Sequence, residues 1–441
     1  MSKRISKDKP AGAMAWVSHT KRILLRLCSL LTALFTTVIL FDTKEGVLQG
    51  LAWGPKLLAS ALSPFLAVLG GLYLIWGVKY RDWYSAVAGA VSAGIAINHV
   101  RNLTPVREAE FAQAFGPDWV DQIPADLRSR LRPYRWAPLY RRRRYGALHR
   151  DVVFGTNSDS GRSLTADLMQ PPPGVPRTGL AAIFVHGGGW WYGRKDITKF
   201  PFFERLVSQG HVVMDVNYTL APYSSVPGMV KDVKQAILWL KQQAATFEID
   251  PTRIVLIGQS AGAHLSLLTA YTPNDPALQP DGSEGDSSVH GVVSYQGPPD
   301  MAALYEDTQH RFVRLFPNGL VTQVHHLLEI FSGHGTSLAG GIAAVMGGTP
   351  EEIPDLYRQL SPINHVSERC PPTLLLQGTH DLLVDYHDVK RLYCALRWAN
   401  APVIHIPFPQ CNHAFEAVLP RLSPPAQTAA YYTERFLALL V

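Results

Sequence analysis

The chain has 441 residues, 47% of them hydrophobic, with a net charge of +6 and a mean hydropathy of +0.02. This length suits one large domain with additional segments, and the near-zero hydropathy excludes a membrane bundle over the whole chain. The four cysteines have the spacing of neither a zinc ribbon nor a disulfide scaffold. A bridge from Cys394 to either Cys370 or Cys411 stays open.

The first 100 residues differ from the rest and predict a membrane anchor. Leu57–Val78 contains 22 residues without a charge. As a helix it would extend about 33 Å, enough to cross a bilayer core. Lys56 and Lys79 flank it, and Trp53 and Trp76 lie towards its ends, as interfacial aromatic residues do.

Two weaker candidate spans lie on either side. Leu27–Phe41 is apolar with a basic front, which also fits an uncleaved signal-like segment. Trp83–Val100 is rich in Ala and Gly, and could span the membrane or pack against its neighbour. We therefore expect a multi-pass membrane protein, anchored in the bilayer by two or three transmembrane helices within residues 1–100.

Residues 101–150 read as a polar connector rich in Arg and Pro. Its run Arg141–Arg144 could contact nucleic acid, but no nucleic-acid fold signature accompanies it. We interpret the run as a solvated surface or a contact with anionic lipid headgroups, and expect no nucleic-acid partner.

Residues 151–441 predict a soluble α/β domain. Helical stretches such as Met229–Ala245 alternate with short apolar runs that predict strands. This alternation predicts a mostly parallel sheet flanked by helices. The irregular segment Gly319–Gly348 is expected to be an insertion over the sheet edge. The predicted strands are Ala181–Val185, Val212–Asp215, Ile254–Ile257, Gly291–Tyr295, Thr373–Leu376 and Val403–Ile406.

The motif Gly258-Gln259-Ser260-Ala261-Gly262 follows one predicted strand and precedes the helix-capable stretch Ala263–Tyr271. This is the strand–turn–helix setting of a nucleophile elbow, in which a strained turn projects the serine hydroxyl from the sheet edge. Small residues at both ends of the motif let strand and helix approach closely. Ser260 is the predicted nucleophile.

A glycine run, His186-Gly187-Gly188-Gly189, follows the strand Ala181–Val185. An acyl-transfer site needs donors where negative charge develops on the carbonyl oxygen, and a glycine loop presents its N–H groups unhindered. We predict an oxyanion hole from Gly188, Gly189 and Ala261, with Gly187 as the alternate. The run lacks the Lys-Ser/Thr pair of a phosphate loop.

The acid and base should follow the serine in the order Asp/Glu, then His. Asp381 lies just beyond the strand Thr373–Leu376, and Asp385 is its competitor. His413 lies in a loop past the last predicted strand and before the closing helix. We therefore predict a triad of Ser260, Asp381 and His413, in which His413 takes the serine proton and Asp381 orients the imidazole.

Together these motifs resemble the hormone-sensitive-lipase-like branch of the α/β-hydrolases, from about Leu164 to the C-terminus. Asn217–Pro222 and Asp250–Arg253 belong to the match. Many relatives have an acidic residue where this chain has Gln259. The segment Gln259–His264 is more similar to isoprenylcysteine methylesterases and kynurenine-formamidase-like enzymes. The resemblance implies an α/β-hydrolase fold and a metal-independent carboxylic-ester hydrolase.

We therefore expect a serine carboxylesterase that acts on apolar or membrane-associated esters without a cofactor. Two alternatives stay open: an amide hydrolase of the formamidase type with the same triad, and a non-catalytic membrane protein on a hydrolase fold. His186, His264 and His413 could approach one another, but no spaced set of metal ligands such as H-E-x-x-H occurs. We expect no metal.

Overall fold

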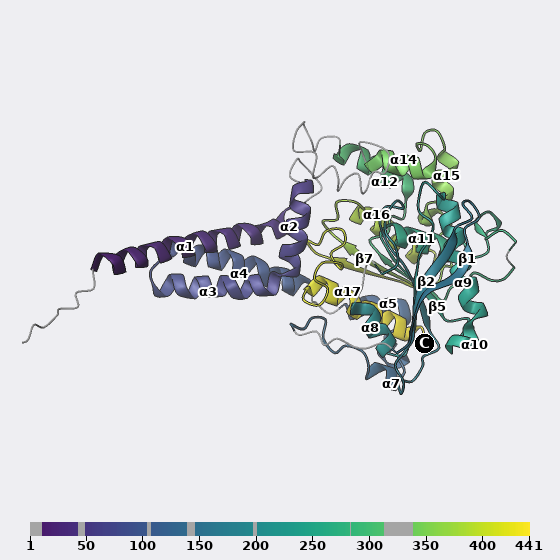
Figure 1. Ribbon diagram of the computed structural model, residues 1–441, viewed down its shortest axis with the longest axis horizontal. Coiled ribbons are helices and arrows are strands. Elements are labelled where there is room, and N and C mark those ends of the chain that lie inside the picture. The colour runs from purple at the N-terminus through teal and green to yellow at the C-terminus, as the bar shows by residue number, and fades with distance from the viewer. Residues whose placement is uncertain are drawn as a thin grey trace, which may run out of the picture.

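A computed structural model describes residues 11–42, 49–103, 107–138, 146–196, 201–282, 284–312 and 338–441. A sheet with helices on both faces forms the larger part, and N-terminal helices form the smaller part (Figure 1). The run Arg141–Arg144 and most of Gly319–Gly348 lie outside the described residues. All four cysteines are described and none forms a disulfide.

The N-terminal helices are α1 (Ala11–Thr37), α2 (Gln49–Ala61), α3 (Ser63–Lys79) and α4 (Trp83–Leu103). Helices α1, α3 and α4 lie side by side and project away from the sheet, whereas α2 stands between them and the larger domain (Figure 1).

Small residues and polar pairs join these helices. A Cβ added at Gly70 of α3 would lie 2.8 Å from the carbonyl oxygen of Gly89 on α4, so these backbones are nearly in contact. Helix α1 is joined to the start of α4 by the ion pair between Arg26 and Asp82, with 2.8 Å between Nε and Oδ1.

The prediction of a multi-pass anchor is wrong. Among the described residues, Thr20–Leu40 is the one helical segment long and apolar enough to cross a membrane by itself. The predicted span Leu57–Val78 is instead divided between α2 and α3, which meet at a bend of 78° and pass the same test only when counted together. Pro64 lies in the first turn of α3 and has no N–H to continue the hydrogen bonding of α2. The described residues therefore contain at most one N-terminal apolar helix that could span a membrane by itself.

The sheet contains eight strands in the described part of the chain, in the order β1-β2-β4-β3-β5-β6-β7-β8. The strands from β4 to β8 in this order run parallel, while β1 and β2 pair antiparallel at one edge. The bounds are β1 Leu148–Thr156, β2 Ser163–Met169, β3 Ala181–Val185, β4 Val212–Val216, β5 Ile254–Gln259, β6 Gly291–Tyr295, β7 Thr373–Gly378 and β8 Val403–Phe408.

Successive strand residues point to opposite faces of the sheet, so the domain has two hydrophobic cores. On β3, Ile183 belongs to the core under α9 and α11, and Phe184 to the core under α8 and α17. The remaining helices are α5 Glu108–Phe115, α6 Trp119–Gln122, α7 Ala125–Arg128, α8 Pro201–Ser208, α9 Val226–Gln242, α10 Ala244–Phe247, α11 Ala261–Tyr271, α12 Met301–Phe312, α14 Leu338–Met346, α15 Pro354–Gln359, α16 Tyr386–Trp398 and α17 Pro424–Leu439.

The six predicted strands are present as β3 to β8, and their mostly parallel arrangement is confirmed. Strands β1 and β2 were not predicted. The pairing of β1 with β2 shifts register twice, between His149 and Val152 and between Val153 and Gly155. Such irregularities remove the strict alternation of apolar and polar residues by which a half-exposed strand is recognised.

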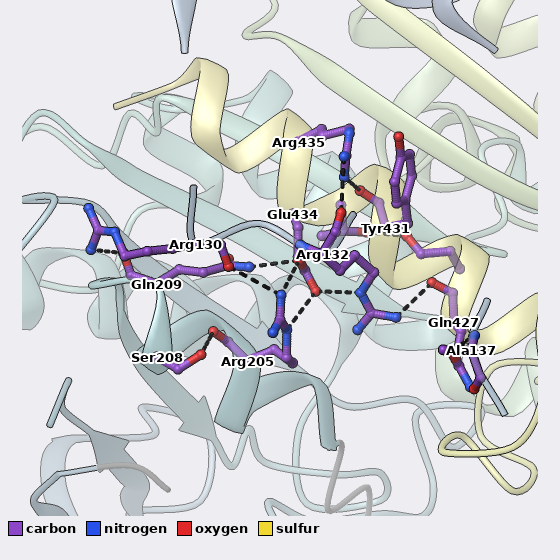
Figure 2. Close-up of polar contacts among 12 residues, drawn as sticks. Arg130, Arg132, Ala137, Arg205, Ser208, Gln209, Gln427, Tyr431, Glu434 and Arg435 are labelled. Carbon is purple, nitrogen blue, oxygen red and sulfur yellow. Dashed lines mark hydrogen bonds and ion pairs between the residues drawn. The ribbon is translucent and has the colours of Figure 1, made fainter. Parts of the chain in front are cut away.

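A buried ion cluster joins the segment before β1 to two helices (Figure 2). Glu434 of α17 accepts hydrogen bonds from Arg132 Nε at 2.8 Å, Arg205 Nη2 at 3.1 Å and Gln209 Nε2 at 2.7 Å. Burial alone would raise the pKa of Glu434, but the two arginines lower it to about 2. Separating Arg132 from Glu434 would leave a buried charge without its partner, which is energetically costly. The cluster therefore holds residue 132 against the catalytic domain.

Candidate active site

Ser260 occupies a strained turn between β5 and α11. Its backbone has φ +52° and ψ −121°, a conformation that non-glycine residues rarely adopt. The neighbouring glycines allow close approach: a Cβ added at Gly258 would lie 2.4 Å from Ala263 Cα, and one at Gly262 only 2.2 Å from the carbonyl oxygen of Val185. The predicted strand–turn–helix geometry is therefore present, with the serine at its apex.

The three predicted triad side chains form one hydrogen-bonded chain. Ser260 Oγ lies 2.9 Å from His413 Nε2, and His413 Nδ1 lies 2.9 Å from Asp381 Oδ2 and 3.1 Å from Oδ1. Since a carboxylate only accepts, His413 Nδ1 carries the proton and Nε2 accepts from the serine hydroxyl. The three residues follow β5, β7 and β8, and so meet at the carboxyl edge of the parallel strands.

Asp381 is fully buried, and the loop around it fixes its carboxylate. Oδ1 accepts from the backbone N–H groups of Leu383 and Val384, each at 2.9 Å. The competing acid, Asp385, instead caps α16 and accepts from the N–H of His387 at 2.7 Å. The geometry thus separates two acids that the sequence left as rivals.

A second buried acid, Glu416, lies near the imidazole. Burial by itself lowers the pKa of His413, but Asp381, by its charge and hydrogen bond, and Glu416, by its charge, together raise it above the ordinary value. Burial raises the pKa of Glu416, yet its two oxygens accept from Gln259 Nε2 at 2.6 Å and Gln296 Nε2 at 2.7 Å. The two donated hydrogen bonds stabilise the charged form and oppose the effect of burial.

The glycine loop lies against Ser260. A Cβ added at Gly187 would lie 3.2 Å from Ser260 Cβ, and one at Gly188, where φ is +126°, would lie 2.0 Å from the carbonyl oxygen of Tyr192. Within the described residues, the backbone N–H groups of Gly188, Gly189 and Ala261 donate to no protein acceptor. They are therefore available to an oxygen atom of a substrate.

Two other histidines near the site have structural contacts. His186 stacks on Tyr218 with ring centroids 4.4 Å apart, which braces the start of the glycine loop. His264 accepts from Trp190 Nε1 at 3.3 Å and donates through Nε2 to the carbonyl oxygen of Leu360 at 2.8 Å. In the part of the chain that the structure describes, no group of three His, Cys, Asp or Glu side chains could hold a metal ion.

Sequence reasoning missed Glu416 and Trp53. Trp53 of α2 donates from Nε1 to the carbonyl oxygen of His413 at 3.1 Å. A lone acid in a loop and a tryptophan 360 positions before its partner follow no sequence pattern. One signal existed: Gln259 stands where many relatives of the resembled family have an acid, and in the fold its amide meets the acid Glu416.

The fold and this site define the class of protein. A mostly parallel sheet carries a nucleophile elbow after β5 and a Ser–His–Asp chain at its carboxyl edge, so the chain is an α/β-hydrolase. It is an enzyme, a carboxylic-ester hydrolase. The chain belongs to the BD-FAE family, which matches residues 167–396.

Among curated proteins, the chain is similar to two esterases of Mycobacterium tuberculosis. It is 30% identical to LipQ over 70% of this chain and 69% of LipQ, and 29% identical to LipC over 80% of this chain and 81% of LipC. A shorter match is to rice ICMEL1, a probable isoprenylcysteine alpha-carbonyl methylesterase, with 36% identity over 33% of this chain and 32% of that protein.

The solved structure of Thermogutta terrifontis esterase 2 phosphoramylated by tabun superposes with a TM-score of 0.50 and 21% identity, over 65% of this chain and 92% of that one. At this identity the likeness supports the fold alone. Membership of the hormone-sensitive-lipase-like branch and nearness to formamidases stay predictions.

Proposed function

We propose that Ser260, His413 and Asp381 are the catalytic triad of a serine esterase, with Gly188, Gly189 and Ala261 as the oxyanion hole. The observation that carries this proposal is the continuous hydrogen-bonded chain from the serine hydroxyl to the buried carboxylate, with 2.9 Å at each link. The strained backbone of Ser260 adds support, because strain of this kind gathers at functional sites.

The proposed reaction has two halves. Ser260 Oγ bonds to the ester carbonyl carbon while its proton passes to His413 Nε2, and the oxyanion accepts hydrogen bonds from the loop N–H groups. The alkoxy C–O bond then breaks, and His413 gives its proton to the leaving alcohol. Water, deprotonated by His413, attacks the acyl-enzyme, which releases the acid and returns a proton to Ser260.

We propose further that the substrates are apolar esters derived from or dissolved in a membrane, and that α1 is the anchor. Thr20–Leu40 supports this, since its length and composition suit a single span. Its leucines face outward: Leu27 is 52% exposed and Leu31 is 65% exposed. A helix that holds the enzyme at a bilayer would raise the local concentration of esters that partition into lipid.

The triad is tested with Ser260→Ala in the full chain. We expect loss of p-nitrophenyl ester hydrolysis and of fluorophosphonate labelling, because the acyl-enzyme cannot form. Ser129→Ala is the matched control, since its hydroxyl contacts only the backbone of Asp126 at an exposed position. Retention of labelling by Ser260→Ala would remove Ser260 from the role of nucleophile.

The anchor is tested with the pair Leu27→Lys and Leu31→Lys, compared with Leu27→Met and Leu31→Met. We expect the lysine pair to be extracted from membranes by alkaline carbonate and to lose activity on long-chain esters, while hydrolysis of a soluble short-chain ester is unchanged. N-terminal sequencing of the mature protein provides the contrary outcome: a chain beginning after residue 41 would make α1 a cleaved signal.

A further inference from the structure

Helix α2 presents one face to the catalytic domain. Trp53, Lys56 and Ser60 are spaced three and four residues apart, so they lie on the same side of the helix. Lys56 and Ser60 are buried, and Trp53 packs against the hydrophobic core of the domain. Burying the polar side chains of Lys56 and Ser60 costs free energy unless they form hydrogen bonds. A helix that only linked an anchor to an enzyme could keep these side chains in solvent.

Trp53 contacts the loop that carries the proposed base. Its Nε1–H donates to the carbonyl oxygen of His413 at 3.1 Å. The same peptide unit is held from the other side, because the N–H of Ala414 donates to Gln296 Oε1 at 2.7 Å. Ala414 has φ +62°, a conformation that L-residues adopt only when their surroundings enforce it. Trp53 and Gln296 together fix this turn, and with it the direction of the imidazole.

Lys56, one turn further along α2, contacts the loop that carries the proposed acid. Its Nζ lies 2.7 Å from His380 Nδ1, and it also donates to the carbonyl oxygen of Phe41. His380 directly precedes Asp381, and its backbone N–H donates to the carbonyl oxygen of Cys411 at 3.0 Å. The ammonium group therefore fixes the acid loop where that loop meets the base loop.

Ser60 extends the contact through α4. Its Oγ lies 2.7 Å from His99 Nε2, and His99 Nδ1 lies 3.1 Å from Gln410 Oε1. Since the Gln410 oxygen only accepts, His99 Nδ1 donates to it and Nε2 accepts from the Ser60 hydroxyl. Gln410 lies three residues before His413, so two N-terminal helices hold the base loop at two points.

We propose that α2 is a positioning element of the active site, in which Trp53 holds the loop of His413 and Lys56 holds the loop of Asp381. The proposal rests on the triad proposed above and adds the segment that aligns it. The N-terminal helices then do more than locate the enzyme, because a displacement of α2 would change the distance and angle between imidazole and carboxylate. A catalytic group displaced by about 1 Å can lose on the order of 100-fold in rate.

The test is Trp53→Phe in the full chain, which removes the Nε1–H and keeps an aromatic ring. We expect kcat to fall about 3- to 10-fold, the factor for one neutral hydrogen bond, with KM within twofold. The acid limb of the kcat–pH profile should move to lower pH, because a looser Asp381 contact raises the pKa of His413 less. Trp398→Phe, at a side chain 90% exposed, is the matched control and should change neither quantity.

Active sites are counted by fluorophosphonate titration, so that kcat refers to folded enzyme only. Lys56→Met provides the second variant, with the same expected loss through the acid loop. A wild-type kcat and pH profile in both variants would overturn the proposal, as would a loss of kcat that disappears after titration. Ser260→Ala, assayed beside them, separates the two proposals. If Ser260→Ala stays active, the proposed triad is wrong. If Ser260→Ala is inactive while Trp53→Phe and Lys56→Met match wild type, only the proposed role of α2 is wrong.

Discussion

Gly262 provides a sharp test of how the elbow and the oxyanion loop depend on each other. In Gly262→Ala the new Cβ would lie 2.2 Å from the carbonyl oxygen of Val185 and 2.3 Å from that of His186. Both carbonyl groups are backbone at the end of β3, just before the glycine loop, so no side-chain rotation can relieve the overlap. The helix α11 and the loop must move apart.

The size of the movement follows from the contact distances. Ordinary contacts of a Cβ begin at 3.4 Å, so a Cβ placed 2.2 Å from a carbonyl oxygen needs the two segments to separate by about 1 Å. Ser260 moves with the elbow, while the proposed donors Gly188 and Gly189 move with the loop. A misplacement of about 1 Å costs on the order of 100-fold, so we expect kcat/KM to fall by about that factor. Overpacking of this kind also lowers the free energy of unfolding by about 1–3 kcal/mol.

The assay is kcat/KM for a p-nitrophenyl ester at a temperature where circular dichroism shows the variant to be folded. Gly94→Ala is the matched control, because a Cβ added there has no heavy atom within 4 Å and lies within α4. The control should keep wild-type activity and gain slightly in helix stability. A Gly262→Ala enzyme with wild-type kcat/KM would refute the idea that glycine at this position sets the spacing of the site.

Two further predictions concern buried charges. Activity needs neutral His413, and because the pKa of His413 is raised, activity should be lost as pH falls through a value above the ordinary 6.5. The charge of Glu416 is one cause of this raised pKa. In Glu416→Gln the acid limb of the kcat/KM–pH profile should therefore move to lower pH. The depressed pKa of Glu434 stabilises the fold above its ordinary value of 4.5, and this contribution is lost as pH falls towards about 2. Glu434→Gln should lower the free energy of unfolding at pH 7 by roughly 3–5 kcal/mol, because it leaves Arg132 and Arg205 buried without their carboxylate.

Each of these predictions has its own check. For Glu416→Gln, the far-ultraviolet spectrum must match wild type, and an unmoved acid limb would show that Glu416 is uncharged at the pH of the assay. For Glu434→Gln, urea unfolding provides the free energy, and Glu306→Gln on the surface-facing side of α12 is the control. Equal stability of wild type and Glu434→Gln would contradict the proposed contribution of the ion cluster in Figure 2.

The parallel core of the fold was predictable because its strands are fully buried. Each of β3 to β7 has buried residues at every position, so apolar runs with turn residues at their ends mark them. The antiparallel edge of the sheet was not predictable from the sequence, since β1 is partly exposed and irregular in register. The N-terminal spans were misassigned for a related reason: apolar composition alone does not reveal the bend between α2 and α3.

The proposed triad could be named in advance because each residue follows a recognisable strand, in a chain order that the fold imposes. What surrounds these residues could not be named. Glu416, Trp53 and Lys56 act through contacts with segments up to 360 positions away, which only the folded chain brings together.

The sequence by itself determined the chemistry proposed for this protein: the elbow, the glycine loop and the order of acid and base are local patterns, each found within a few residues of a buried strand. Only the tertiary structure showed that Asp385, the competitor of the predicted Asp381, caps a helix instead, and that α2 packs against the catalytic domain. The physical reason is that strands, helices and their turns leave a repeating pattern of apolar residues in the sequence. The alignment of the site depends instead on hydrogen bonds between segments far apart in the chain, and no repeating sequence pattern marks such pairs.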